Sequence, residues 1–185
     1  MKRAILFILI LVLAVPGAFA KGPHKGETPE STGKGDDGGF YIGLGSGVDL
    51  PGSKWDSNYE LGGGTDVFAG FQLDRNLAAQ LDVQELFFTG GGSSLNNVRV
   101  TAQAKYAFEG KDFQPYILAG PGLVFQNLSP SGDSTTNFDA LGGLGIQFDL
   151  APRTHLFVEA KYNFIMSQTT TFSDVPVSAG LWVGL

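Results

Sequence analysis

Seven charged residues are the main candidates for chemistry, because each lies on the polar side of a run in which polar and apolar residues alternate. They are four acids and three bases: Asp66, Asp82, Arg99, Lys105, Asp139, Glu159 and Lys161. In β-strands, alternate side chains point to opposite faces, so these seven would share one face. If the strands close into a small barrel, opposite charges could pair and plug its interior, or the same residues could line a narrow ion path. We favour the plug, because buried charges persist when they are paired and the two signs are nearly balanced here.

A second candidate site is His155, which is the one histidine in the alternating runs. A serine hydrolase needs a histidine within hydrogen-bond distance of a serine, with a carboxylate that orients the ring. His155 directly follows a short turn, and Asp149 is its expected cross-strand neighbour. We interpret the two as a hydrogen-bonded pair at the rim. The sequence therefore predicts no catalytic residues, no metal site and no cofactor.

The elements that position these side chains are clearest over residues 142–164, GGLGIQFDLAPRTHLFVEAKYNF. In the second half, Leu156, Val158 and Ala160 alternate with His155, Phe157 and Glu159, whereas a helix would place apolar residues every three or four positions. Ala151, Pro152 and Arg153 are expected to form the turn, because proline fixes φ and donates no hydrogen bond. This stretch is typical of a β-hairpin.

Eight such runs follow one another from residue 39 onward. The predicted strands cover residues 40–49, 61–73, 77–88, 98–108, 113–126, 138–150, 155–164 and 177–185. Three short turns alternate with four longer polar loops, among them 89–97, 127–136 and 167–176. Pro121 predicts a bulge or an edge-like break in the fifth strand, and Glu85 interrupts the alternation of the third. The pattern predicts an all-β fold, an eight-stranded antiparallel up-and-down transmembrane β-barrel.

Alternation alone leaves open which face points outward, since a secreted lipocalin-like ligand-binding barrel alternates with its apolar face inward. The polar face is poor in lysine and glutamate, unlike most solvated surfaces. Seven aromatic residues lie near predicted strand ends, where membrane barrels carry aromatic girdles. They are Phe40, Phe108, Phe113, Phe138, Phe148, Tyr162 and Phe164. Both features favour a membrane barrel with the apolar face outward.

The amino-terminal part has the pattern of a secreted protein. Residues 1–20 combine Lys2 and Arg3, an apolar run and a small-x-small end, which predicts a cleaved signal peptide. Residues 21–38 are rich in glycine, proline and charge, and we expect a disordered periplasmic tail or linker before the barrel domain at 39–185. The net charge of −6 argues against nucleic acid as a partner. The chain has no cysteine, which excludes disulfides and thiol chemistry.

Several segments resemble a known family. Residues 114–120 (QPYILAG), 143–148 (GLGIQF) and 158–162 (VEAKY) are similar to strands of the small eight-stranded outer-membrane barrels of the OmpA/OmpX type. The resemblance covers residues 39–185 and implies a porin-like fold in the lipid bilayer of the bacterial outer membrane. It also implies that the barrel-assembly machinery reads a signal in the last strand. The matching positions are Ser178, Gly180, Val183 and Leu185, although the family usually ends in phenylalanine or tryptophan.

From these observations we expect a monomer that serves envelope integrity or cell-surface interaction, with a lumen plugged by charges and without enzymatic activity. Lys54, Trp55 and Tyr59 in the first long loop are the candidate contacts for a cell-surface partner. The alternatives are a lipid A modifying outer-membrane enzyme, a narrow porin and the secreted lipocalin-like barrel.

Overall fold

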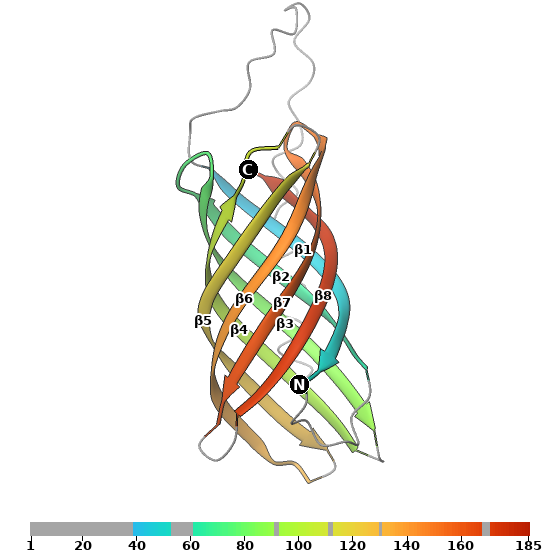
Figure 1. The fold of residues 1–185 in the computed structure, drawn as a ribbon. Helices are drawn as coiled ribbons and strands as arrows, with labels where there is room; N and C mark the ends of the chain where they lie inside the picture. Colours follow the sequence, from blue (N-terminus) through green and yellow to red (C-terminus); the bar gives the residue numbers. More distant parts are fainter. Residues whose placement is uncertain (1–38, 53–60, 91–92, 111–112, 130, 168–170) are drawn as a thin grey trace, which may run out of the picture. The chain divides into compact units, whose positions relative to one another are not determined.

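The computed structural model describes residues 39–52, 61–90, 93–110, 113–129, 131–167 and 171–185, which form a closed barrel of eight strands (Figure 1). The strands are β1 (Phe40–Pro51), β2 (Gly62–Gln72), β3 (Leu77–Gly90), β4 (Ser93–Ala107), β5 (Gln114–Ser129), β6 (Ser134–Ala151), β7 (Thr154–Met166) and β8 (Thr171–Gly184). The predicted fold class is confirmed. The expected signal peptide and tail, residues 1–38, lie outside the described residues.

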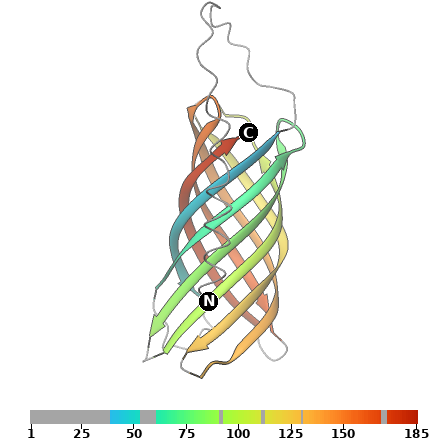
Figure 2. The same cartoon turned by 180° about the vertical axis from the view of Figure 1, so that it is seen from behind.

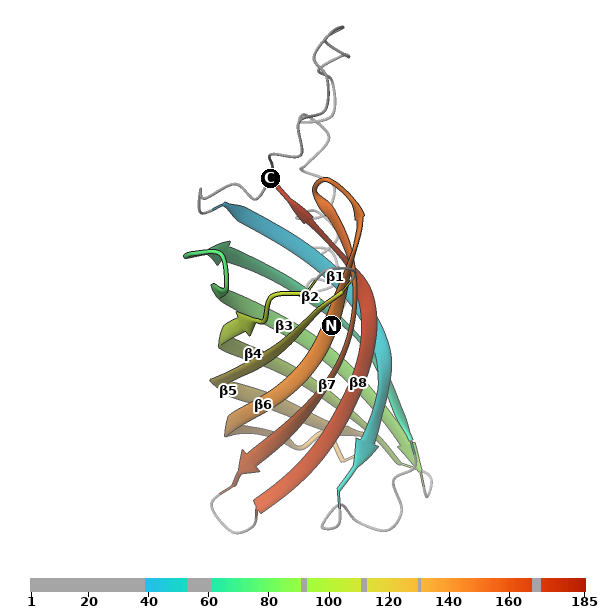
Figure 3. The same cartoon turned by 45° about the horizontal axis from the view of Figure 1, so that its top comes forward.

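Every strand is antiparallel to its neighbours, and β8 pairs with β1 to close the ring (Figures 2 and 3). The closing ladder runs from Tyr41 opposite Gly184 to Pro51 opposite Asp174. Closure gives each strand two partners, as lipid requires of a spanning sheet. In the described part of the chain, no helix is long and apolar enough to cross a membrane.

The barrel has two rims, defined by its connections. One end, here called the turn rim, carries the turns at 73–76 and 152–153, the end of β4 with the start of β5, the start of β1 and the end of β8. The other end, here called the loop rim, is defined by the ends of β1, β3, β5 and β7 and the starts of β2, β4, β6 and β8.

Apolar side chains point outward and polar ones inward. Leu144, Leu81 and Ile117 are 66%, 54% and 51% exposed. Asp139 and Lys161 belong to the opposite parity, meaning the alternate positions whose side chains point to the other face of the strand, and are 0% and 3% exposed. Six of the seven predicted girdle aromatics are also among the exposed large side chains: Phe40, Phe108, Phe113, Phe138, Tyr162 and Phe164. A soluble ligand-binding barrel would bury these residues, so the lipocalin-like alternative is wrong.

The loops predicted at the loop rim are wrong for three of the four connections. β3 and β4 stay paired to Gly90 opposite Ser93, and β5 and β6 to Asn127 opposite Ser134. β8 begins at Thr171 rather than at residue 177. The polar residues of these segments had suggested loops, but strand pairing uses backbone groups and continues beyond the apolar outer face. Glu85 also stays in regular register and produces no bulge.

Two prolines interrupt the ladder on one side only. Gly120 and Pro121 pair with β6 but have no ladder partners on β4, and the register on either side of the gap is unchanged. The predicted edge-like break is therefore confirmed, without a bulge. Val175 and Pro176 likewise pair with β1 and have no ladder partners on β7. A proline lacks the N–H that would continue the ladder, so each gap follows from its chemistry.

Candidate functional site

The lumen is filled by layers of side chains, which we describe from the turn rim upward. The first layer is aromatic: Tyr41, Phe68 and Phe157 are buried, and Trp182 packs against them. The ring centroids of Phe68 and Phe157 lie 5.4 Å apart, in edge-to-face contact. Gly43 provides the space for this layer, because a Cβ atom there would lie 2.1 Å from Cζ of Phe68.

Lys105 is buried beside the aromatic layer. Its Nζ lies 3.9 Å from the centroid of the Tyr116 ring and donates a hydrogen bond to Oε1 of Gln147 at 2.8 Å. The aromatic face and the amide oxygen together replace the water that a lysine normally binds. No carboxylate is therefore needed as its direct partner.

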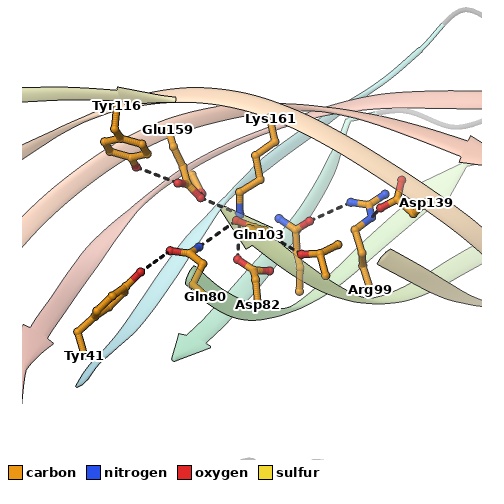
Figure 4. Close-up of polar contacts among 12 residues, drawn as sticks. Tyr41, Gln80, Asp82, Arg99, Gln103, Tyr116, Asp139, Glu159 and Lys161 are labelled. Carbon is orange, nitrogen blue, oxygen red and sulfur yellow. Dashed lines mark hydrogen bonds and ion pairs between the residues drawn. The ribbon is translucent and has the colours of Figure 1, made fainter. Parts of the chain in front are cut away.

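The next layer, which we call the central cluster, contains Asp66, Asp82, Glu159 and Lys161. Nζ of Lys161 lies 2.9 Å from Oδ2 of Asp82 and 2.8 Å from Oε1 of Glu159 (Figure 4). The hydroxyl of Tyr116 donates to Oε2 of Glu159 at 2.8 Å. All four members of the cluster are at most 5% exposed. Each of the three acids offers one oxygen within 4.8 Å of the others, which makes them the candidate metal ligands of the described chain.

A chain of neutral hydrogen bonds runs beside the central cluster (Figure 4). The hydroxyl of Tyr41 donates to Gln80 at 3.0 Å, Gln80 donates to Gln103 at 2.9 Å, and Gln103 donates to Thr101 at 2.7 Å. These amides satisfy one another in the dry interior, so they cross the lumen without adding charge.

The outer cluster lies closer to the loop rim and consists of Arg99 with three aspartates. Nε of Arg99 is 2.8 Å from Asp139, and Nη2 is 2.8 Å from Asp174. Nη1 donates to Gln84 at 2.9 Å. Asp49 is fully buried nearby, and neither of its carboxylate oxygens has a side-chain partner. Beyond this cluster the lumen is apolar again, with Leu86, Phe88 and Leu95 buried against one another.

The charge balance differs from the sequence prediction. The seven predicted residues all lie buried in the lumen, but Asp49 and Asp174 join them. Six buried carboxylates therefore face three buried bases in the described part of the chain, and the near balance predicted from the sequence is wrong. Parity would have identified both residues. Asp49 continues the series Tyr41, Gly43 and Gly45, and Asp174 was assigned to a loop that is strand.

His155 lies at the turn rim and pairs with Asp149 across the ladder, as predicted. Nδ1 of His155 is 2.7 Å from Oδ1 of Asp149, and its ring stacks on Trp182 with centroids 3.7 Å apart. It is the one histidine among the residues that the structure covers. The contacts found for its ring are thus a carboxylate and an indole, as in a structural rim pair.

The other predicted site residues are placed only in part. Lys54, Trp55 and Tyr59 lie outside the described residues. In β8, Ser178 and Gly180 face the lumen and Val183 faces outward, and Leu185, directly after the strand, is exposed. Recognition of these four positions by the assembly machinery stays a prediction.

Comparisons with known proteins agree with this architecture. No curated protein matches the chain. Among solved structures, Neisserial surface protein A has a TM-score of 0.71 at 19% identity, with 80% of this chain and 99% of that chain covered. The amino-terminal β-barrel domain of Pseudomonas aeruginosa OprF has a TM-score of 0.56 at 14% identity, covering 80% of this chain and 100% of that one. The outer membrane enzyme PagL has a TM-score of 0.51 at 18% identity, with 77% of this chain and 99% of that chain covered.

These similarities establish the fold. A model of the outer membrane protein β-barrel domain matches residues 5–181, which is most of the chain. With the closed barrel and the apolar outer face, this match places the protein in the bacterial outer membrane. The chain therefore belongs to the outer membrane protein β-barrel family.

Proposed function

We propose that this barrel does not conduct ions and that it serves the envelope through its outer surface, in envelope integrity or cell-surface interaction, without enzymatic activity. The observation that carries the proposal is the filled lumen. Arg99, Lys161 and Asp139 are at most 3% exposed, and each has a charged partner in contact. An eight-stranded barrel has an interior just wide enough for side chains, and these filled layers support a lumen without a continuous water path.

The narrow porin is the alternative that uses the same residues differently. Passage of an ion would require Lys161 to leave two carboxylates and the aromatic layer around Phe157 to open. Breaking one buried ion pair costs about 3–5 kcal/mol, which makes such openings rare. The test is single-channel recording of the folded barrel in planar bilayers. We expect no conductance steps above the bilayer background, and regular steps in the wild type would refute a closed lumen.

The enzymatic alternative has one supporting observation, since the enzyme PagL shares the fold. Against it, His155 is held by Asp149 and Trp182 at the turn rim, whereas lipid A lies in the leaflet at the other rim. We expect lipid A from cells expressing His155→Ala to carry the same acyl chains as lipid A from cells with the wild type. A change in acylation that depends on His155 would favour the enzyme.

The surface role is best tested at the first connection of the loop rim. Lys54, Trp55 and Tyr59 remain the candidate contacts for a partner, and the barrel is expected to act as a monomer after assembly through the signal in β8. Replacing residues 54–59 with glycine and serine should leave the heat-dependent gel migration of the barrel unchanged. Attachment of cells to host or abiotic surfaces should fall, and attachment equal to the wild type would argue against this loop.

A further inference from the structure

The central cluster carries more negative charge than its one base can neutralise. Asp82 and Glu159 share the ammonium of Lys161, whereas neither carboxylate oxygen of Asp66 has a hydrogen-bond partner. Asp66 is 1% exposed and reaches within 4.8 Å of both other acids. A buried carboxylate without a partner is costly, so this position calls for a cation. We propose that Asp66, Asp82 and Glu159 bind one Ca²⁺ ion inside the barrel.

The charge of the cluster selects a divalent ion. Three carboxylates and one ammonium leave a formal charge of −2, which one divalent cation would bring to zero. A monovalent ion would leave an uncompensated charge in the dry interior. Lys161 need not leave, because each carboxylate has about four lone-pair positions and Lys161 occupies one on each of its partners.

The spacing of the oxygens favours calcium among divalent ions. Ligand atoms up to 4.8 Å apart can lie on opposite sides of one ion at about 2.4 Å from each, which is a calcium–oxygen distance. Magnesium requires about 2.1 Å and usually retains several waters. A narrow void beside Asp66, lined also by Gln84 and Ser178, has no room for a hydration shell.

The layers on both sides determine how an ion could reach this position. Tyr41, Phe68 and Phe157 separate the central cluster from the turn rim, and the outer cluster around Arg99 separates it from the loop rim. An ion would therefore be enclosed while the barrel closes rather than taken up afterward. The proposal concerns the interior and does not depend on the surface role proposed above.

The experiment is to refold the full barrel from urea into detergent micelles, once with about 1 mM CaCl₂ and once with EDTA. After gel filtration in calcium-free buffer, we expect about one Ca²⁺ per barrel by mass spectrometry in the first sample. We also expect a higher urea midpoint in that sample than in the EDTA sample. A wild type that retains no calcium and shows equal midpoints would overturn the proposal.

Two variants separate this site from general charge effects. Asp66→Asn removes the unpartnered carboxylate with little change in shape and should abolish both calcium retention and the midpoint difference. Asp49→Asn is the matched control, because Asp49 is equally buried and also lacks a side-chain partner but belongs to the outer cluster. It should retain calcium like the wild type. Equal retention by Asp66→Asn and the wild type contradicts the assignment, and heat-dependent gel migration shows that each variant has folded.

Discussion

Replacing Arg99 with methionine tests whether the outer cluster is held by its one cation. Arg99 is 1% exposed and contacts Asp139 and Asp174 at 2.8 Å each, with Asp49 nearby. Methionine fills similar space without charge, so the aspartates lose their compensation and little volume is lost. Breaking a buried pair in this way costs about 3–5 kcal/mol.

Protonation gives a second estimate of this cost, because a buried carboxylate that has lost its cation becomes neutral by binding a proton. For an aspartate with an ordinary pKa of about 3.9, that uptake costs about 1.4 kcal/mol per pH unit, or roughly 4 kcal/mol at pH 7 and about 2 kcal/mol at pH 5.5. The two estimates agree at neutral pH. In the variant the folded state then binds more protons than the unfolded state, so its stability falls as pH rises.

The assay is urea unfolding of the barrel in lipid vesicles, followed by tryptophan fluorescence at pH 5.5 and pH 7. We expect Arg99→Met to lose about 4 kcal/mol at pH 7 and about half of that at pH 5.5. Adding Asp139→Asn and Asp174→Asn to the same chain should recover most of the loss, since the coupled charges are then gone. A loss below about 1 kcal/mol at pH 7, or one that is independent of pH, would refute the reasoning.

Three further perturbations test other parts of the barrel. Val158→Lys places a charge on the lipid face, where Val158 is 40% exposed, and should cost about 2–4 kcal/mol in vesicle unfolding if that position lies near the bilayer midplane. Gly43→Ala should cost about 1–3 kcal/mol by crowding Phe68, whereas Gly142→Ala, with no atom within 4 Å of the new Cβ, should be close to neutral in the same assay. In the turn between β2 and β3, the backbone N–H groups of Asn76 and Leu77 donate to Asp74 and hold the pKa of its carboxyl below the ordinary value. Asp74→Ala should therefore lower the urea midpoint at pH 7, and the difference should disappear as acid protonates Asp74 in the parent; a difference that persists at pH 2 would count against this account.

The sequence was sufficient for the architecture because alternation is a direct consequence of strand geometry. The parity of residues such as Leu144 and Lys161 correctly indicated which side chains face lipid and which face the lumen. Strand ends were less predictable, because Ser94 or Asn127 can pair through the backbone whatever its side chain prefers. The mistake then propagated to the interior, since Asp174 was placed in a loop.

Which charges touch could not be predicted from parity alone. Arg99 reaches Asp174 across 75 residues of sequence, and Lys161 reaches Asp82 across 79. Such contacts depend on the height of each residue in the closed barrel, and that height is set by the register of every ladder between them. Only closure of the ring makes them neighbours.

The two prolines weaken the barrel wall at two of its eight strand interfaces. The gaps at Pro121 and Pro176 lie in the β4–β5 and β7–β8 interfaces, whereas the other interfaces have no such proline gap in the parts described. These seams divide the ring into a shell of three strands, β5 to β7, and a shell of five, β8 to β4. Thermal opening of the barrel wall would be greatest at these two interfaces, and the two groups of strands between them would move as rigid units. Amide hydrogens beside the seams would then be the first in the wall to exchange with deuterium.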